Sequence, residues 1–159
     1  MNLTADKAAA VKEYQSGSKE TKESLIRLFG QVFFDPISDE IMRKFKAACS
    51  EQGKDPDKIL HAGTDLDIEQ IVANAYTMLR VLAKAFRKNW EPDFANPNQW
   101  KYYPWFDWEA GVGFVVDDAG YGTASTGTSV GSRLCFENSS DAIAFGKEFS
   151  ELYRIIFSH

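Results

Sequence analysis

The sequence has few of the residues that carry most enzyme chemistry. Among 159 residues there are two histidines, His61 and His159, and two cysteines, Cys49 and Cys135. No CxxC, HxxxH or EF-hand spacing is present, so the common zinc and calcium motifs are excluded. A nucleophile needs an adjacent base, and no local motif pairs His61 with a cysteine or serine. We therefore expect no bound metal, no cofactor and, on balance, no enzymatic activity.

The sequence also lacks long apolar runs and any excess of positive charge. No stretch approaches the roughly 18 apolar residues of a membrane span, and the start, MNLTADKAAA, lacks the apolar core of a signal peptide. The net charge is −5, whereas a nucleic-acid-binding protein needs a basic patch. These absences predict no membrane or nucleic-acid partner and a cytoplasmic location. Both cysteines are expected to be buried thiols, with a disulfide left open.

Two glycine patterns imitate phosphate-binding loops but are incomplete. Gly120 and Gly122 begin a G-x-G pattern, yet Ser125 stands where a dinucleotide-binding motif needs its third glycine. Gly122 and Gly127 have the spacing of a P-loop, yet Thr128 stands where the lysine is required. Because no helix is predicted directly after either pattern, the usual anion-binding geometry is missing.

Apolar residues recur at helical spacing through the first half of the chain. Two helices are expected within residues 4–30, the second capped by Ser18. A third is expected at 38–53, with Gly53 as its stop. Asp55-Pro56 then starts a short helix, because proline suits the first helical position.

The longest predicted helix follows, capped by Thr64 or Asp65 and ended at Asn89. Its apolar residues keep a period of 3.6 over some twenty residues. Its last turns are crowded with cations, which the helix dipole favours there. The apolar set is Ile68, Ile71, Val72, Ala75, Met78, Leu79, Leu82 and Phe86, and the cations are Arg80, Lys84, Arg87 and Lys88.

An aromatic stretch at residues 89–108 divides the chain. It holds all four tryptophans and three of the five prolines. Prolines oppose helix, so the chain must turn or extend here. The pattern predicts a strand from Trp100 onward, with Pro104 at a sheet edge or bulge.

Alternation along that strand predicts two unequal faces. Trp100, Tyr102 and Phe106 are expected to face the core, and Tyr103 and Trp105 to face outward. Exposed aromatic rings are typical binding anchors.

The predicted fold is α+β in a single domain over residues 1–159. It has a helical part at 1–89, an aromatic and sheet part at 90–136 with a small antiparallel sheet, and a closing helix packed on that sheet. After the aromatic stretch the expected order is a strand at 112–116, a turn at 117–120, a Gly/Ser/Thr loop at 119–132, a strand at 130–136 that contains Cys135, and a helix at 139–157 capped by Ser139.

Several segments carry a resemblance. They are NW-P-D at 89–93, N-KYYPWF around 98–106, VGSRLCF at 130–136 and FGKEFSELY at 145–153. With Arg27-Leu28-Phe29-Gly30 upstream, they resemble an uncharacterised protein family of gut Bacteroidetes and their phages and prophages. The resemblance runs through most of the chain. It implies a bacterial host cytoplasm or a virion as location, and it carries over no activity and no catalytic residue.

The leading hypothesis is a non-enzymatic interaction or accessory protein, phage- or prophage-associated, that binds a protein partner through its aromatic sheet edge and flexible loop. The candidate binding residues are Tyr103, Trp105, Trp108, Tyr121 and Arg133.

Two alternatives stay open. Asp93, Asp107 and Glu109 flank tryptophans, which suits a small hydrolase or a sugar- or ligand-binding protein, with Arg133 as a further candidate. Asp107 and Glu109 could also gather around a cation with Asp117 and Asp118, although solvated turn carboxylates are the commoner explanation. The second alternative is a virion structural subunit, which predicts self-association.

Overall fold

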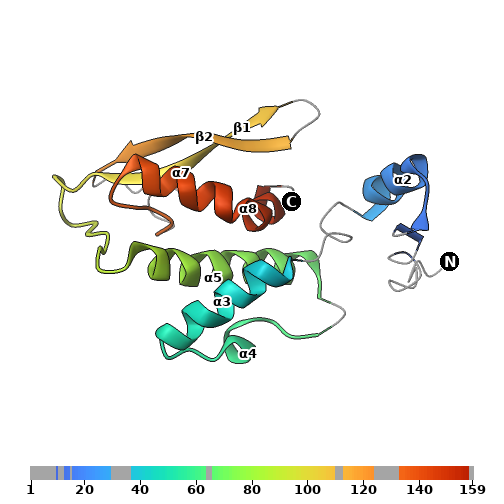
Figure 1. Cartoon of the computed structure of the whole chain (residues 1–159), viewed down its shortest axis with the longest axis horizontal. Coiled ribbons are helices and arrows are strands. Elements are labelled where there is room, and N and C mark those ends of the chain that lie inside the picture. The colour runs from blue at the N-terminus through green and yellow to red at the C-terminus, as the bar shows by residue number, and fades with distance from the viewer. Residues whose placement is uncertain are drawn as a thin grey trace. The chain divides into compact units, whose positions relative to one another are not determined.

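The fold is α+β, as predicted, and combines helices with a two-stranded antiparallel sheet (Figure 1). The computed structural model describes residues 10, 13–14, 16–29, 37–63, 66–109, 113–123 and 133–157. The chain forms two compact units, Met1–Ser38 and Asp39–Phe157. The prediction of one domain over residues 1–159 stays a prediction. No helix within the described ranges is long and apolar enough to cross a membrane.

The first unit contains α2, Lys19–Phe29. Ser18 precedes it, and its hydroxyl accepts a hydrogen bond from the backbone N–H of Thr21 at 3.3 Å. This confirms Ser18 as the predicted cap. Of the helix expected upstream, the described residues Ala10, Glu13 and Tyr14 are helical. Its predicted start at Thr4 lies outside the described residues.

The second unit begins with α3, Asp39–Glu51, and α4, Pro56–Ile59. The buried face of α3 is the predicted one, formed by Ile41, Phe45, Ala48 and Cys49. Gly53 follows α3 with a φ of +62°, a conformation that favours glycine. Asp55 caps α4 by accepting from the N–H of Asp57 at 3.1 Å. In this region the structure agrees with what neighbouring residues in the sequence predicted.

The longest helix is α5, Ile68–Arg87, and its N-cap is Asp67. The prediction of Thr64 or Asp65 as the cap was wrong; both lie outside the described residues. Asp67 and Gln70 form a capping box, in which each side chain accepts from the other's backbone N–H, at 2.8 and 3.1 Å. At the other end Lys88, with a φ of +57°, is the C-cap in place of the predicted Asn89.

We expect Asp67→Ala to lower the free energy of unfolding by about 1 kcal/mol. The N–H of Gln70 loses its acceptor, and the reciprocal hydrogen bond from the N–H of residue 67 to the Gln70 side chain is weakened. The control is Glu69→Ala in the same first turn, an exposed side chain outside the capping box. Urea titrations followed by circular dichroism measure both. An equal, small change in both variants would contradict the role of Asp67.

The sheet is one hairpin, β1 at Lys101–Glu109 paired with β2 at Gly113–Gly122. The predicted turn at 117–120 was wrong, as was the start of the predicted loop, because these residues belong to β2. Asp117 is the extra residue of a bulge, since Trp105 pairs with Asp118 and Phe106 with Val116. Gly120 lies beneath the Tyr103 ring, which a Cβ at that position would overlap. The small residues that suggested a loop therefore serve close packing here.

Of the strand predicted at 130–136, the described residues 133–136 form one bridge, and residues 130–132 lie outside the described residues. Phe136 and Tyr102 exchange two backbone hydrogen bonds, of 3.0 and 2.7 Å, whereas Leu134 and Cys135 lie outside any strand. Arg133, with a φ of +61°, has a left-handed backbone that does not fit a strand. Residues 124–132, most of the predicted loop, lie outside the described residues.

The closing segment is two helices in place of the single one predicted at 139–157. These are α7, Ser139–Glu148, and α8, Ser150–Phe157, with a break at Phe149. The cap is Asn138 in place of the predicted Ser139, because the Asn138 side chain accepts from the N–H of Asp141 at 2.8 Å. The break lets α7 and α8 pack on different elements.

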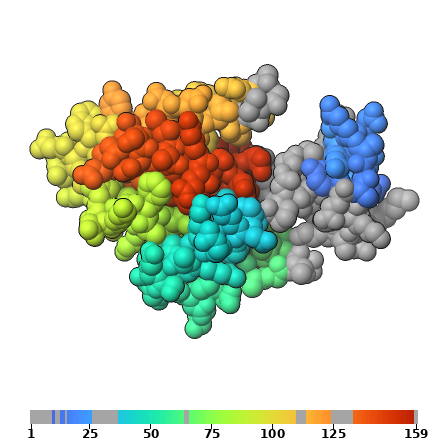
Figure 2. Space-filling model, in the orientation of Figure 1, coloured from blue at the N-terminus to red at the C-terminus, as the bar shows by residue number. Residues whose placement is uncertain are grey.

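The second unit is layered. The hairpin lies on α7, α8 packs on α5, and α3 packs on another side of α5 (Figures 1 and 2). Gly146 allows α7 to approach the sheet closely, since a Cβ there would lie 2.7 Å from Cβ of Pro104. The yellow segment after α5 covers one end of this unit (Figure 2). The largest fully buried apolar side chains are Phe45, Phe136, Phe145, Met78, Leu79 and Leu152.

Candidate functional site: an apolar groove and a basic pocket

The aromatic stretch exposes much of its ring surface. Trp105 is 50% exposed, Trp108 68% and Tyr121 63%, as expected for outward rings. Trp100 is 52% exposed, so its predicted place in the core was wrong. It precedes the first residue of β1, so strand alternation does not govern its side chain. Tyr103 is half-buried over Gly120.

The five candidate binding residues do not form one site. Trp108 packs edge-on against Phe114, with ring centroids 5.1 Å apart, near the hairpin turn. Tyr121 packs against Trp100 at 5.3 Å, at the other end of the hairpin. Tyr103 and Trp105 do come together in one groove, and Arg133 lies in a separate pocket.

We call the first cavity the apolar groove. Its volume is about 400 Å³. It is lined by residues 103–106 of β1, by Phe114 of β2, by Tyr76 of α5, by Leu134, and by Tyr153, Ile156 and Phe157 of α8. Its walls are almost entirely carbon, which suits an apolar occupant.

The apolar groove follows the outer edge of β1. Successive strand residues point to opposite faces, so a cavity lined by four consecutive ones must pass the strand's edge. Within the described ranges, the only pairing along this edge is the bridge between Tyr102 and Phe136. Among the described residues, the backbone from Tyr103 onward therefore has no strand partner on the side of the groove.

Tyr153 is the polar member of the groove's inner wall. Its ring packs on Phe106 and Phe157, with centroids 4.6 and 5.9 Å away. Burial raises the pKa of Tyr153 far above its ordinary value, so the hydroxyl stays neutral. That hydroxyl has no hydrogen-bond partner among the described residues. Tyr153 therefore adds no charge to the groove.

We call the second cavity the basic pocket. It lies beside the C-terminal half of α5 and has a volume of about 350 Å³. Its charged lining is Lys54, Arg80, Lys84, Arg87, Arg133 and Glu91. The apolar groove and the basic pocket share no lining residue.

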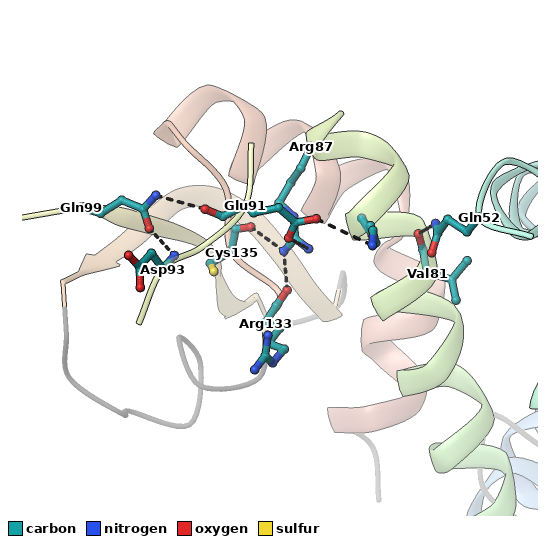
Figure 3. A network of polar contacts seen from close by, with 9 residues as sticks. Gln52, Val81, Arg87, Glu91, Asp93, Gln99, Arg133 and Cys135 are labelled. Atoms are coloured by element: carbon teal, nitrogen blue, oxygen red, sulfur yellow. Dashed lines mark hydrogen bonds and ion pairs between the residues drawn. The ribbon is translucent and has the colours of Figure 1, made fainter. Parts of the chain in front are cut away.

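Arg87 is the buried centre of this pocket (Figure 3). Its side chain is 6% exposed, and Nη1 donates to the carbonyls of Arg133 and Cys135 at 2.7 and 3.2 Å. Nη2 lies 3.7 Å from the Glu91 carboxylate. Burial lowers the pKa of Arg87, an effect that Glu91 partly opposes. Arg87 thus ties the segment around Cys135 to the end of α5.

Both cysteines are free and buried. Burial raises the pKa of the Cys135 thiol and that of Cys49, so neither is an activated nucleophile.

The residues of the hydrolase alternative are not brought together, because Arg133 lines the basic pocket whereas Asp93 lines neither cavity. His61, Asp107 and Glu109 line neither the apolar groove nor the basic pocket. His61 is exposed, and its backbone is held by the Asn74 side chain. Among the described residues, no three His, Cys, Asp or Glu side chains lie close enough together to hold a metal ion.

The sequence prediction missed the basic pocket. Arg80, Lys84 and Arg87 follow an i, i+4, i+7 spacing, which places them on one face of α5. That spacing was a usable signal, but it was ascribed to the helix dipole alone. No family model, no curated protein and no solved structure matches this chain, so any function must be inferred from the geometry described above.

Proposed function

We propose that this is a non-enzymatic interaction protein whose apolar groove binds an extended, apolar segment of a partner protein. The segment adds to the outer edge of β1 as a third strand, in the manner of β-strand addition. Residues 103–106, which line the groove where β1 has no strand partner among the described residues, are the observation that carries the proposal.

The bridge at Phe136 supports this binding mode. At Tyr102 the outer edge of β1 already pairs with another part of the chain, Phe136, through two backbone hydrogen bonds. The groove begins at the next residue of β1, Tyr103, and Leu134 lines it as well. A bound strand would continue the pairing that Phe136 begins, and Pro104, which has no N–H to donate, would limit its length and register.

The chemistry of the groove favours an apolar segment. Aromatic and aliphatic side chains of α8 and β1 form its walls, and Trp105 stands half-exposed among them. Apolar side chains alternating along an added strand would enter the groove, while backbone hydrogen bonds would supply affinity without sequence preference. The phage or prophage association remains part of this proposal and is supported by the sequence resemblance alone.

The test uses two tryptophans as a matched pair. A random heptapeptide library is selected on the purified protein, and we expect the binders to have alternating apolar residues. Binding of the selected peptides is then measured by fluorescence anisotropy. We expect Trp105→Ala to weaken binding about tenfold or more, as for a central aromatic anchor. Trp100→Ala, equally exposed but outside the groove, should change it less than about twofold.

Three results would contradict the proposal. They are a library without binders, an equal loss in both variants, and a dimer in light scattering that Trp105→Ala dissociates. The last result would assign the apolar groove to self-association. Amide hydrogen exchange gives a second measure, because a bound strand should protect the N–H groups of Phe106 and Trp108.

A further inference from the structure

The basic pocket concentrates positive charge in an acidic protein. Five cationic residues and one carboxylate line it, an excess of four charges, whereas the whole chain carries −5. The C-terminal end of α5 contributes roughly half a negative charge, which reduces this excess only slightly. Ordinary surface lysines are interleaved with acids, so a concave cluster of this kind needs a separate explanation.

Lys101 is a buried cation that lies over the same aromatic ring as Arg133 of the pocket. Lys101 is fully buried, and its Nζ donates to the carbonyl of Gln99 at 2.9 Å. No carboxylate in the described part of the chain forms an ion pair with it. Its Nζ lies 5.5 Å from the ring of Phe94, and the guanidinium of Arg133 lies 5.6 Å from the same ring. A buried cation without a carboxylate is costly, and an anion bound beside Arg133 would offset part of that cost.

The backbone of Arg133 fixes the segment to α5, whereas its side chain faces the basic pocket. Its carbonyl accepts the hydrogen bond from Arg87, and its backbone has a φ of +61°. Its side chain is exposed and lines the pocket beside Phe94. Replacing this side chain therefore leaves the link to Arg87 in place.

Glu91 compensates the pocket only loosely. Its carboxylate lies 3.7 Å from Arg87 Nη2 and 3.9 Å from Lys84 Nζ, both beyond hydrogen-bond length. Its backbone carbonyl is held by the Gln99 side chain at 3.1 Å (Figure 3). The Nε of Arg87 is buried without a partner among the described residues. The exposed cations of the pocket, Arg80, Lys84 and Arg133, thus remain available to a ligand that brings more negative charge than one carboxylate.

We infer that the basic pocket binds a small polyvalent oxyanion of the phosphate class. Guanidinium groups match phosphate oxygens in pairs, and Arg80, Arg87 and Arg133 surround one cavity. The pocket is concave, about 350 Å³ in volume, and has no aromatic ring among its lining residues on which a base could stack. A short phosphate chain, free or as part of a small metabolite, fits this chemistry.

Calorimetric titration with inorganic pyrophosphate tests the inference on the whole chain. We expect one site per chain, with affinity that falls as salt is raised to about 0.15 M. Arg133→Gln and Arg80→Gln should each weaken binding about tenfold, since each removes a charge-assisted contact. Lys46→Gln, an exposed cation of α3 outside the pocket, should leave affinity within about twofold.

The result that overturns the inference is either no pyrophosphate binding at millimolar concentration or an equal loss in all three variants. Thermal melts of each variant exclude unfolding as the cause. Trp105→Ala should bind pyrophosphate normally, because the two cavities share no residue. The inference therefore stands or falls independently of the peptide-binding proposal. Parallel titrations with orthophosphate and a nucleoside triphosphate show whether one phosphate is enough and whether an attached group adds affinity.

Discussion

Replacing Phe145 by alanine is expected to lower the free energy of unfolding by about 3 to 5 kcal/mol. Phe145 is fully buried on α7. Its ring centroid lies 4.7 Å from those of Phe136 and Phe149, and 5.5 Å from that of Phe86. These partners come from α5, from the segment after the sheet and from the break between α7 and α8. Deleting the ring removes buried apolar area and leaves a cavity that three separate elements would have to fill.

Phe157→Ala provides the matched control. Phe157 is also an aromatic of the closing helices and contacts the rings of Phe106, Phe114 and Tyr153, but it is 44% exposed. The same deletion should cost about 1 to 2 kcal/mol there, since half of the ring is already in water. Urea unfolding followed by tryptophan fluorescence measures both variants. If the two lost equal stability, the core would not be centred on Phe145.

Local signals in the sequence predicted the local structure well. The apolar stripe of α3, its end before Gly53 and the Asp55-Pro56 start of α4 all depend on residues within one or two turns of one another. The Asp67–Gln70 capping box was equally visible as D-x-x-Q, but Thr64 and Asp65 were chosen because the preceding Gly63 suggested an earlier start.

The sheet was harder to predict because tertiary contacts decide it. Asp117, Asp118 and Gly120 have the composition of a turn, yet a bulge absorbs Asp117 and the Tyr103 ring requires glycine at position 120. Likewise the apolar spacing of residues 139–157 is continuous, and only the packing of α7 on the sheet and of α8 on α5 explains the break at Phe149. Periodicity reports which residues are buried, not which element they are buried against.

For the two cavities too, the sequence predicted local features but not tertiary arrangement. Tyr103 and Trp105 were predicted as candidates from alternation, because exposure on one strand is a local property. The groove itself depends on α8, some fifty residues further along the chain. The basic pocket joins α5 to Arg133, which is 46 residues from Arg87. No spacing rule links such distant residues, so the sequence supplied the components of both cavities without their arrangement.

Replacing Arg87 by methionine is expected to lower the free energy of unfolding by about 2 to 3 kcal/mol. Methionine keeps most of the aliphatic stem but leaves two carbonyls without their donor. The carbonyl of Arg133 is near solvent and can bind water, whereas that of Cys135 is partly buried and loses its bond outright. Removing a buried cation relieves some desolvation, but losing charge-assisted hydrogen bonds costs about 1.5 to 3 kcal/mol each, so the loss prevails.

Arg80→Met is the control, because Arg80 lies two turns earlier on α5 and is exposed; it should change stability by less than about 0.5 kcal/mol. The stability loss of Arg87→Lys should lie between those of Arg87→Met and Arg80→Met. An ammonium keeps the charge but lacks the planar geometry that reaches both carbonyls.

The thiol of Cys135 provides a second, local measurement. Arg87 holds the backbone on both sides of Leu134, so its loss should free this segment and expose the buried thiol. In a Cys49→Ala background, a thiol reagent should therefore label Cys135 faster in Arg87→Met than in Arg80→Met under native conditions. Unchanged labelling together with unchanged stability would show that Arg87 is not what fastens the segment around Cys135 to α5. A loss of stability with unchanged labelling would instead locate its contribution in the end of α5 itself, through Glu91.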